Sequence, residues 1–289
     1  MDRVKLILLC GIPGSGKTTY ATKYIEEHPG TVHISSDKIR FELWGNEATQ
    51  GDNNEVFYRM QTRAINALNF GSDVIYDCTN MTRKDRSNII AACPKFVKIE
   101  AHVIWAPIET CIERDANRKR TVGKEVIDRM LKRFQPPYYD EGIDVIYLEW
   151  PDDFNPDEYS KNMWKKIKIP HDNPHHTLDI NEHCLEASAN AMKFNNRELE
   201  YAALWHDIGK SYTKGFVDSK GNPCDTAHYY NHQNYSAWIS YGLPFTTPTI
   251  AWLIGAHMEP FGNTKYYNKL PEYLKRYVDM LHECDVNAH

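Results

Sequence analysis

Apolar residues follow two different periodic patterns along the chain, and the pattern changes near Trp150. In the first part, short apolar runs alternate with stretches in which apolar residues recur every three or four positions. The runs predict strands at 4–10, 32–35, 73–77, 98–105 and 144–148. The stretches predict helices at 17–27, 55–70, 83–92 and 108–134. Strands that alternate with helices indicate an α/β domain whose parallel sheet is flanked by helices.

The second part of the chain has a different pattern. Residues 151–156 and 168–174 are rich in Pro, Asp and Asn, which is typical of connecting segments. Beyond them only helical periodicity is visible, and it predicts helices at 178–194, 197–208, 231–241, 248–257 and 272–285. We therefore expect an α/β domain, a linker and an all-α helical domain, at 1–152, 153–173 and 174–289.

Composition and charge narrow the class of protein. The chain has 289 residues and a formal net charge of −5, which argues against a protein that coats nucleic acid non-specifically. The longest apolar run, at 4–10, is far too short to cross a bilayer. The start of the chain does not resemble a secretory leader, and the seven cysteines include no CxxC spacing. We therefore expect reduced thiols, a cytoplasmic location and no membrane partner.

A glycine-rich segment follows the first predicted strand. Residues 11–18 match the pattern G-x-x-x-x-G-K-[ST], between a strand and a helix as that motif requires. Its glycines let backbone N–H groups surround phosphate oxygens, and the helix N-terminus adds a partial positive charge. Lys17 is expected at the terminal phosphates of ATP, and Thr18 at Mg²⁺. The contacts expected for the nucleotide come from Gly11, Pro13, Gly14, Ser15, Gly16, Lys17, Thr18 and Thr19.

Charged residues follow the next two predicted strands. Asp37 comes directly after the second strand, where a carboxylate can accept the proton of an attacking hydroxyl group. Arg40, three residues later, can hold an acceptor phosphate. Asp77 ends the third strand and can orient the water shell of Mg²⁺. An acid at such a turn is more often a helix cap, and the position opposite the phosphate loop favours the catalytic interpretation.

Basic residues are dense near the end of the predicted α/β domain. Arg114 and Arg118 are four residues apart and would share one face of a helix. A basic lid can close over a triphosphate and neutralise the charge that develops during transfer. We expect Arg118 to contact the transferred phosphate, with Arg120 as the second choice. Arg83 and Arg86 add positive charge that favours a polynucleotide acceptor.

Together these motifs resemble the 5′-hydroxyl polynucleotide kinases of the P-loop superfamily, in particular the phage-type enzymes. The resemblance covers roughly residues 1–150 and depends on GIPGSGKTT, SSDKIR, DCTN and ERDANRKRTV. It implies these roles: Lys17 and Thr18 on ATP and Mg²⁺, Asp37 as general base, Arg40 on the acceptor phosphate and Arg118 on the donor phosphates. The basic run Arg-Lys-Arg at 118–120 leaves the choice of arginine open.

Histidines concentrate in the second half, where ten of the 13 lie from His171 onward. His206 and Asp207 are adjacent at the end of a predicted helix, and such a pair can bind divalent metal, with the carboxylate bridging two ions. Further N and O donors lie on other predicted helices: His183, His232, His257 and Asp285. A single histidine on a helix is more often a core or surface residue than a ligand. Six donors on successive helices instead favour a metal site.

This region resembles the HD superfamily of metal-dependent phosphohydrolases across about residues 174–289. The pattern H…HD…H…H…D maps to His183, His206, Asp207, His232, His257 and Asp285. The resemblance implies a helical bundle that holds one or two metal ions, with Asp207 at the catalytic centre. Asp279 is an alternative to Asp285, and Lys210 is expected near phosphate. A His/Asp set without Cys favours Mn²⁺, Fe²⁺, Co²⁺, Ni²⁺ or Mg²⁺ over structural zinc.

The two halves together predict a bifunctional end-healing enzyme that acts on nucleic acid, with RNA preferred. The first half would phosphorylate 5′-OH ends with ATP, and the second would remove 2′,3′-cyclic or 3′-phosphate. The expected partners are RNA or DNA ends that carry these groups, with an RNA ligase acting downstream. Two alternatives stay open: a nucleoside or nucleotide kinase fused to an HD nucleotidase, and an HD hydrolase gated by ATP.

Overall fold

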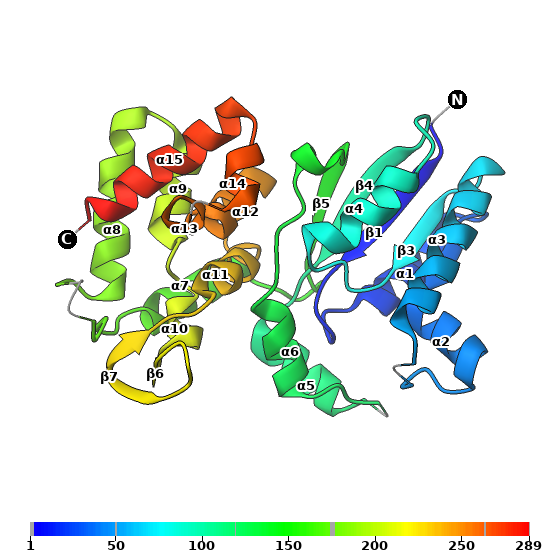
Figure 1. Cartoon of the computed structure of the whole chain (residues 1–289), viewed down its shortest axis with the longest axis horizontal. Coiled ribbons are helices and arrows are strands. Elements are labelled where there is room, and N and C mark those ends of the chain that lie inside the picture. The colour runs from blue at the N-terminus through cyan, green and yellow to red at the C-terminus, as the bar shows by residue number, and fades with distance from the viewer. Residues whose placement is uncertain (1–2, 50, 119, 174–176, 263, 289) are drawn as a thin grey trace. The chain divides into compact units, whose positions relative to one another are not determined.

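The computed structural model divides the chain into two units (Figure 1). Unit 1 comprises Met1–Met130 with Pro137–Asp152, and unit 2 comprises Leu131–Pro136 with Asp153–His289. The structure describes residues 3–49, 51–118, 120–173, 177–262 and 264–288. Among these residues, no helix combines the length and the apolar character needed to span a membrane.

Unit 1 is built on a five-stranded parallel sheet with the strand order β2-β3-β1-β4-β5. The strands are β1 (Lys5–Cys10), β2 (Val32–Ser35), β3 (Val74–Asp77), β4 (Lys98–Ile104) and β5 (Val145–Glu149). The central strand β1 pairs with β3 on one side and β4 on the other, so that Leu9 lies opposite both Asp77 and His102. Residues 6–10 are fully buried because helices cover both faces of the sheet.

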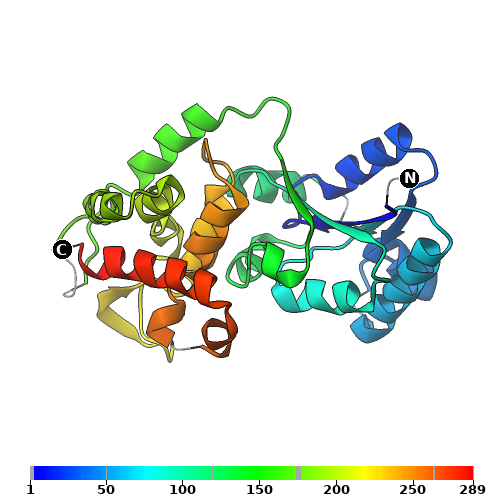
Figure 2. The ribbon, with the colours of Figure 1, turned by 90° about the horizontal axis from the view of Figure 1, so that it is seen from above.

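Helices lie on both sides of this sheet (Figure 2). On one face, Ala21 of α1 (Lys17–Glu27) packs into a cluster with Ile7 and Ile75. The other face is covered by α3 (Asn53–Asn69) and α4 (Arg83–Ala92). In α3 the buried residues recur every fourth position, which explains its clear helical signal: Val56, Met60, Ala64 and Leu68.

Two features of unit 1 differ from the sequence predictions. The predicted helix at 108–134 is divided into α5 (Ile108–Ala116) and α6 (Lys124–Leu131). The Asp115 carboxylate accepts hydrogen bonds from the backbone N–H groups of Val122 (3.0 Å) and Gly123 (2.9 Å), and these bonds fix the turn between the helices. Because α5 ends before Arg118, the prediction that Arg114 and Arg118 share a helical face is wrong.

Unit 1 also contains two elements that the sequence did not predict. A helix, α2 (Ser36–Trp44), begins directly after β2, and a 3₁₀ helix, η1 (Tyr139–Glu141), precedes β5.

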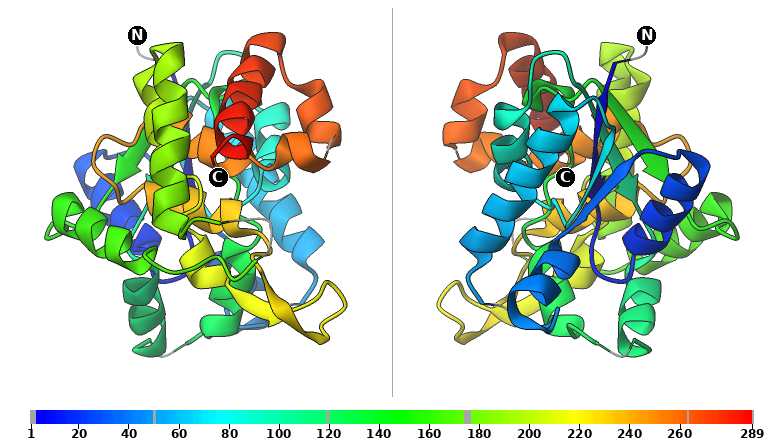
Figure 3. Two further views of the ribbon diagram at one scale, coloured as in Figure 1. Left: turned by 90° about the vertical axis from the view of Figure 1, so that its left-hand side faces the viewer. Right: turned by 90° about the vertical axis from the view of Figure 1, so that its right-hand side faces the viewer.

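Unit 2 consists mainly of helices (Figure 3). They are α7 (Pro156–Lys166), α8 (Ile180–Ala191), α9 (Arg197–Trp205), α10 (Lys210–Thr213), α11 (His232–Ser240), α12 (Pro248–Ala256), α13 (Glu259–Gly262), α14 (Lys265–Lys269) and α15 (Glu272–Val286), with a 3₁₀ turn, η2 (Met192–Phe194), after α8. Helices α8 and α15 lie side by side, and Asn190 of α8 donates a hydrogen bond to the carbonyl of Cys284 (3.3 Å). The apolar helix α12 is buried over most of its length, as a helix at the centre of a bundle must be.

The predicted linker at 153–173 is wrong over part of its length, because it contains α7. Asn155 caps this helix and Pro156 begins it, which are standard signals of a helix start. The side chain of Met163 is buried, and the ring of Trp164 packs edge-on against that of Trp205, with 5.4 Å between the ring centroids. The helix therefore belongs to the core of unit 2.

The prediction that the second half is all-α is also wrong. Unit 2 contains an antiparallel hairpin of β6 (Gly215–Val217) and β7 (Pro223–His228). Its turn is fixed by Asp218, whose Oδ1 accepts hydrogen bonds from the backbone of Lys220 and Asn222, both at 2.8 Å. Most of the hairpin is exposed or half-buried, so its strands lack the apolar alternation that sequence reasoning detects.

Candidate phosphate-binding site and candidate metal centre

The glycine-rich loop of unit 1 connects β1 to α1. Gly14 and Gly16 have φ angles of +84° and +110°, which residues with a Cβ rarely adopt. A Cβ at Gly14 would lie 2.2 Å from the carbonyl oxygen of Cys111, and one at Gly11 would lie 2.6 Å from that of Ile104. Only glycine fits at Gly11 and Gly14, because the loop backbone packs directly against β4 and α5 there, and this packing fixes the conformation of a loop that can bind phosphate. The other predicted contacts lie in the loop or in the first turn of α1: Pro13, Ser15, Thr18 and Thr19.

Lys17 begins α1 and folds back over the loop. Its Nζ donates hydrogen bonds to the carbonyl oxygens of Gly11 (2.8 Å) and Ile12 (3.0 Å). Desolvation lowers the pKa of Lys17, and the nearby Asp77 carboxylate opposes that shift. The loop also lies at the point where the strand order reverses. After β1 the chain continues to β2 at one edge of the sheet, and after β4 it continues to β5 at the other edge. Ligands of open α/β sheets bind at such a switch point.

Asp77 is buried at the end of β3 and has a partner that sequence reasoning missed. The Nε2 of His33 on β2 lies 3.0 Å from its Oδ2, and the Nζ of Lys38 lies 3.2 Å from the Nδ1 of the same imidazole. No motif marks His33 in the sequence. It reaches Asp77 because β2 and β3 are neighbours in the sheet, and strand order is not visible in the hydrophobic pattern.

Asp37 lies in the first turn of α2 and is about half exposed. Its Oδ1 lies 3.5 Å from Nη1 of Arg40 and 3.2 Å from Nη1 of Arg120, while Nη2 of Arg40 donates to Asn53 (3.0 Å). The arginine that meets Asp37 is therefore Arg120, our second choice. Arg118 and Arg114 are exposed, and Arg118 follows the end of α5. Lys119 lies outside the described residues.

Arg83 and Arg86 do not contribute to an exposed basic surface, so that interpretation is wrong. Arg83 forms a two-bonded ion pair with Asp140, with both N–O distances at 2.8 Å. Arg86 is fully buried and forms the same type of pair with Glu141, again at 2.8 Å. Both guanidinium groups connect α4 to η1 within unit 1.

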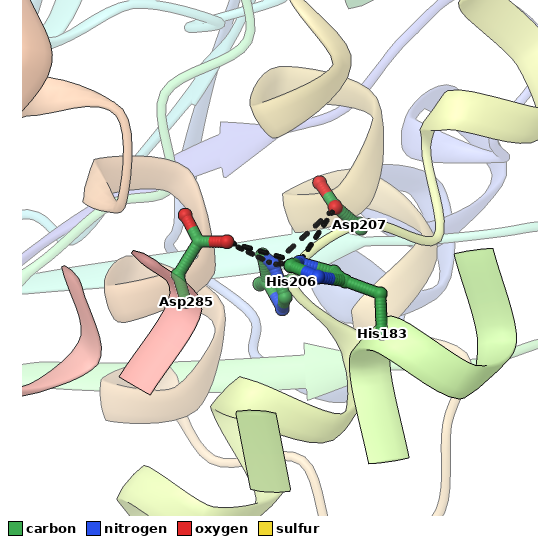
Figure 4. Close-up of side chains that lie close together, drawn as sticks. All are labelled: His183, His206, Asp207 and Asp285. Carbon is green, nitrogen blue, oxygen red and sulfur yellow. Dashed lines mark hydrogen bonds and ion pairs between the residues drawn. The ribbon is translucent and has the colours of Figure 1, made fainter. Parts of the chain in front are cut away.

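Unit 2 brings together all six side chains that we expected to bind metal (Figure 4 shows four of them). They form two groups that share Asp207: His183, His206, Asp207 and Asp285 in one, and Asp207, His232 and His257 in the other. Within each group, one ligand atom per residue lies within 4.8 Å of the others. The two groups together offer four imidazole nitrogens and two carboxylates, which suits a divalent ion that prefers N and O ligands.

Asp207 faces the two groups with different oxygens. Its Oδ2 lies 3.3 Å from Nε2 of His206 and 3.5 Å from Nε2 of His183. Its Oδ1 lies 3.0 Å from Nε2 of His232 and 3.9 Å from Nε2 of His257. Asp285 completes the first group, with Oδ1 at 3.0 Å from His183 and 3.3 Å from His206. A carboxylate with this orientation can bridge two ions.

The helices bring the six residues together from distant parts of the sequence. His183 lies on α8, and His206 and Asp207 follow α9 directly. His232 begins α11, His257 follows α12, and Asp285 lies in the last turn of α15. Gly209 allows the close approach of α11, since a Cβ there would lie 2.2 Å from the carbonyl oxygen of His232.

All four imidazoles are oriented in the same way by the backbone. Each Nδ1 lies 2.7–3.0 Å from a carbonyl oxygen, the acceptors being Ala288, Ala203, Tyr229 and Ile254. A carbonyl only accepts, so Nδ1 carries the proton and a neutral imidazole presents the lone pair of Nε2. These Nε2 atoms face each other at 3.3 Å (His183 and His206) and 3.1 Å (His232 and His257). Two facing Nε2 lone pairs repel unless a proton or a metal ion lies between them, so the arrangement can accommodate a metal ion.

Two residues of the cluster have the charge states that metal binding requires, and a third must lose a proton. Burial lowers the pKa of His257 to about 3, and the neighbouring His206 and His232 add to the shift, so this imidazole is neutral at neutral pH. Burial opposes ionisation of Asp207, but His206 and Lys210 outweigh it and hold the pKa of the carboxyl well below its usual range. The cluster therefore offers ionised carboxylates and a neutral imidazole, the forms in which these groups bind metal. Burial lowers the pKa of His206, but Asp207 and Asp285 outweigh it and hold the pKa of this imidazole well above its usual range, so it must lose a proton before it can bind a metal ion.

Two residues selected with the cluster, Lys210 and Asp279, have contacts that the sequence did not predict. Lys210 Nζ lies 2.6 Å from Oδ2 of Asp207 and 3.3 Å from Nε2 of His171. The sequence analysis had selected Lys210 but not His171. Asp279, the alternative to Asp285, is exposed and accepts a hydrogen bond from Tyr267, away from the cluster. His175 and His176 lie outside the described residues.

A cavity of about 540 Å³ in unit 2 opens onto this cluster. Its lining includes the carboxylates of Asp207 and Asp285, two of the imidazoles and Lys210. His183 and His206 are almost completely buried and are not part of the lining, so they lie behind the carboxylates. A ligand that enters the cavity would therefore meet the carboxylates of the cluster, His232, His257 and Lys210.

Comparisons with known proteins each match only part of the chain. A family model described as an AAA domain matches residues 6–137. A curated relative, "Transcription factor bHLH140" of Arabidopsis thaliana, is 27% identical over 161 residues, which are 52% of this chain and 17% of that protein. Another, "L-seryl-tRNA(Sec) kinase" of Methanococcus maripaludis, is 29% identical over 144 residues, which are 46% of this chain and 53% of that protein. The chain thus spans at most about half the length of these two relatives.

Solved structures with similarity to this chain include protein chains of the Pnkp1/Rnl/Hen1 RNA repair complex and of a fungal RNA kinase. The first is 21% identical with a TM-score of 0.43, and the match covers 46% of this chain and 44% of that chain. The second is 17% identical with a TM-score of 0.39, and the match covers 58% of this chain and 90% of that chain. The AAA-domain match at 6–137 covers most of unit 1, which is an α/β domain of the P-loop type with a parallel sheet flanked by helices.

Proposed function

We propose that this chain is a bifunctional end-healing enzyme for RNA. Unit 1 would transfer the terminal phosphate of ATP to a 5′-OH end, and unit 2, as an HD-type phosphohydrolase, would remove a 2′,3′-cyclic or 3′-phosphate. The observation that supports this most strongly is the presence in one chain of a phosphate loop and of a buried cluster of four histidines and two aspartates. One curated relative of the first half is named as a kinase that acts on a tRNA, which supports an RNA-linked acceptor.

In unit 1, the loop and Lys17 would bind the phosphates of ATP. Asp37 would accept the proton of the 5′-hydroxyl as its oxygen attacks the terminal phosphorus and the bond to ADP breaks. Arg40 and Arg120, which contact the Asp37 carboxylate, would orient it, and Arg40 would also bind the acceptor phosphate. Arg118, whose charge acts on Lys17, would bind the donor phosphates, with Arg120 as the second choice. When bound at Thr18 and near Asp77, Mg²⁺ neutralises charge on the phosphates.

In unit 2, the six residues of the cluster would hold one or two divalent ions, with Asp207 between them. Such ions supply an acidified water and neutralise charge on the phosphoryl oxygens. Attack of water on the phosphorus of a 2′,3′-cyclic phosphate breaks one P–O bond and leaves a monoester. A second hydrolysis releases phosphate and leaves both hydroxyls of the terminal ribose. Lys210 would stabilise the negative charge of the phosphate from within the cavity.

A second candidate is a nucleoside or nucleotide kinase joined to a nucleotidase. Two observations favour it: the formal net charge is −5, and the internal ion pairs of Arg83 and Arg86 remove part of the positive charge expected for polynucleotide binding. Chain-length dependence separates the two candidates, since a mononucleotide enzyme gains nothing from longer oligomers. An ATP-gated hydrolase is a third possibility and predicts no labelled acceptor.

Single substitutions can test whether the two activities are separate. We expect Lys17→Ala to abolish transfer from ATP to a 5′-OH oligoribonucleotide and to preserve metal-dependent release of the 3′-phosphate. We expect Asp207→Ala to have the opposite effect. Lys23→Ala in α1 and Asp225→Ala in β7 replace exposed residues of the same types and serve as controls. If the wild-type protein phosphorylates nucleosides and no oligonucleotide, the proposed acceptor is wrong.

A further inference from the structure

The cavity above the metal cluster has a floor and a wall of different chemistry. Its floor is charged and carries Asp207, Asp285 and Lys210. Its wall includes three neighbouring side chains from the segment before α11 and one from α13: His228, Tyr229, Tyr230 and Phe261. A phosphate group by itself needs only the floor, so the wall indicates a ligand with a second, flat and apolar part.

Two of the aromatic side chains are unusually accessible. Tyr230 is 42% exposed and Phe261 is 55% exposed, although both line a cavity. The Tyr230 ring stacks on His228 with a centroid distance of 5.3 Å and an interplanar angle of 6°, so a flat surface is already formed. The Phe261 ring is held by an edge-on contact with His282, with 4.3 Å between the ring centroids. Rings supported in this way lose little conformational freedom when a ligand stacks on them.

We propose that Tyr230 and Phe261 form a nucleobase platform, which binds the base of the 3′-terminal nucleotide while its phosphate lies over the metal cluster. This inference rests on the proposed phosphohydrolase function and names the part of the substrate that the cavity selects. Nucleobases of single-stranded ends stack on exposed aromatic side chains in many RNA-binding proteins. Lys210, on the charged floor, supplies a cation for the phosphate of the same nucleotide.

The size of the cavity supports a single nucleotide as the bound unit. Its volume of about 540 Å³ lies within the range of small-molecule sites. A base-paired duplex end is far larger than such a space, so the terminal nucleotide must be unpaired to enter. The platform therefore predicts selectivity for single-stranded 3′ ends and tolerance of base identity, because every base offers a flat face.

A pair of matched substrates tests the platform. One is a short oligoribonucleotide with a 3′-phosphate, and the other is the same oligonucleotide with an abasic 3′-terminal residue. We expect the wild-type protein with Mn²⁺ to prefer the base-bearing substrate in kcat/KM by roughly 5- to 150-fold. In the Tyr230→Ala/Phe261→Ala variant this ratio should approach one. Tyr230→Phe, which keeps the ring, should preserve the ratio, as should Tyr273→Ala, which replaces an exposed tyrosine of α15 outside the cavity.

The outcomes separate this inference from the proposed function. Equal hydrolysis of the two substrates by the wild-type protein, or an unchanged ratio in the double variant, would overturn the platform and leave the hydrolase proposal standing. Hydrolysis of neither substrate with any of the expected divalent ions would overturn both. A melting temperature of the double variant close to that of the wild type shows that a lost preference does not come from misfolding.

Discussion

Asp207 shows at the residue scale how one side chain can organise a site. Its two oxygens face different pairs of imidazoles, and each of those imidazoles is held by a backbone carbonyl. The buried carboxylates and the imidazole lone pairs of the cluster repel one another when no cation lies between them. A bound metal ion should therefore stabilise the folded protein. Stability should therefore depend on bound ions more strongly in this protein than in a variant that lacks Asp207.

We expect Mn²⁺ to stabilise the wild-type protein and chelation to destabilise it. A ligand at 100 times its Kd adds about 2.7 kcal/mol to the free energy of unfolding, which raises Tm by roughly 5–10 °C for a chain of this size. Thermal unfolding with Mn²⁺ and with EDTA measures the shift. Asp207→Asn should lose most of it, and an equal shift in the variant would argue against the metal centre.

Gly14 carries the corresponding prediction for the phosphate loop. Gly14→Ala should lower the affinity for ATP at least tenfold, since the loop must move to relieve the 2.2 Å contact with Cys111. Gly30→Ala is the matched control, because Gly30 has a φ of +98° and no atom within 4 Å of the added Cβ. Both changes should cost about 1–2 kcal/mol of stability through backbone strain. Titration with a labelled ATP analogue measures the affinity, and equal affinity of the two variants would contradict the prediction.

At the element scale, the sequence determines some structures more clearly than others. The bounds of α1, β2 and α4 agree with the sequence predictions because apolar spacing and capping residues such as Thr82 are local signals. The division between α5 and α6 was missed because it depends on hydrogen bonds to the Asp115 carboxylate from the backbone of Val122 and Gly123, and such bonds do not alter the spacing of apolar residues. The hairpin of unit 2 was missed because few of its residues are buried.

The ion pair of Arg86 and Glu141 joins two elements, α4 and η1, and allows a prediction about stability. Arg86→Met should lower the free energy of unfolding by about 3–5 kcal/mol, because the buried Glu141 carboxylate would lose both hydrogen bonds from Arg86 and keep, among the described residues, only the backbone N–H of Tyr138 and a longer contact with Arg83. Arg63→Met removes a pair with Glu42 in which both side chains are almost half exposed, and should cost less than about 1 kcal/mol. Urea denaturation measures both, and equal losses would show that burial does not decide the strength of these pairs.

At the scale of the whole molecule, the sequence predicted which side chains come together in unit 2 more reliably than it predicted their individual contacts. Six candidate ligands could be selected because His and Asp recur on apolar helices, where such residues need a reason to be buried. The imidazole beside Asp77 and the histidine beside Lys210 could not be selected, and the contact of Arg120 with Asp37 was not predicted. Each of these contacts depends on how elements pack, and none leaves a periodic trace in the sequence.

The proposed enzyme would process both ends of a broken RNA strand at two separate sites. The most direct measurement is mass spectrometry of a single oligoribonucleotide with a 5′-OH and a 2′,3′-cyclic phosphate, after incubation with the wild-type protein, ATP, Mg²⁺ and Mn²⁺. We expect a product that has gained a 5′-phosphate and lost its terminal phosphate at the 3′ end. An oligonucleotide that keeps both original ends, under conditions in which free nucleosides are phosphorylated, would contradict this expectation.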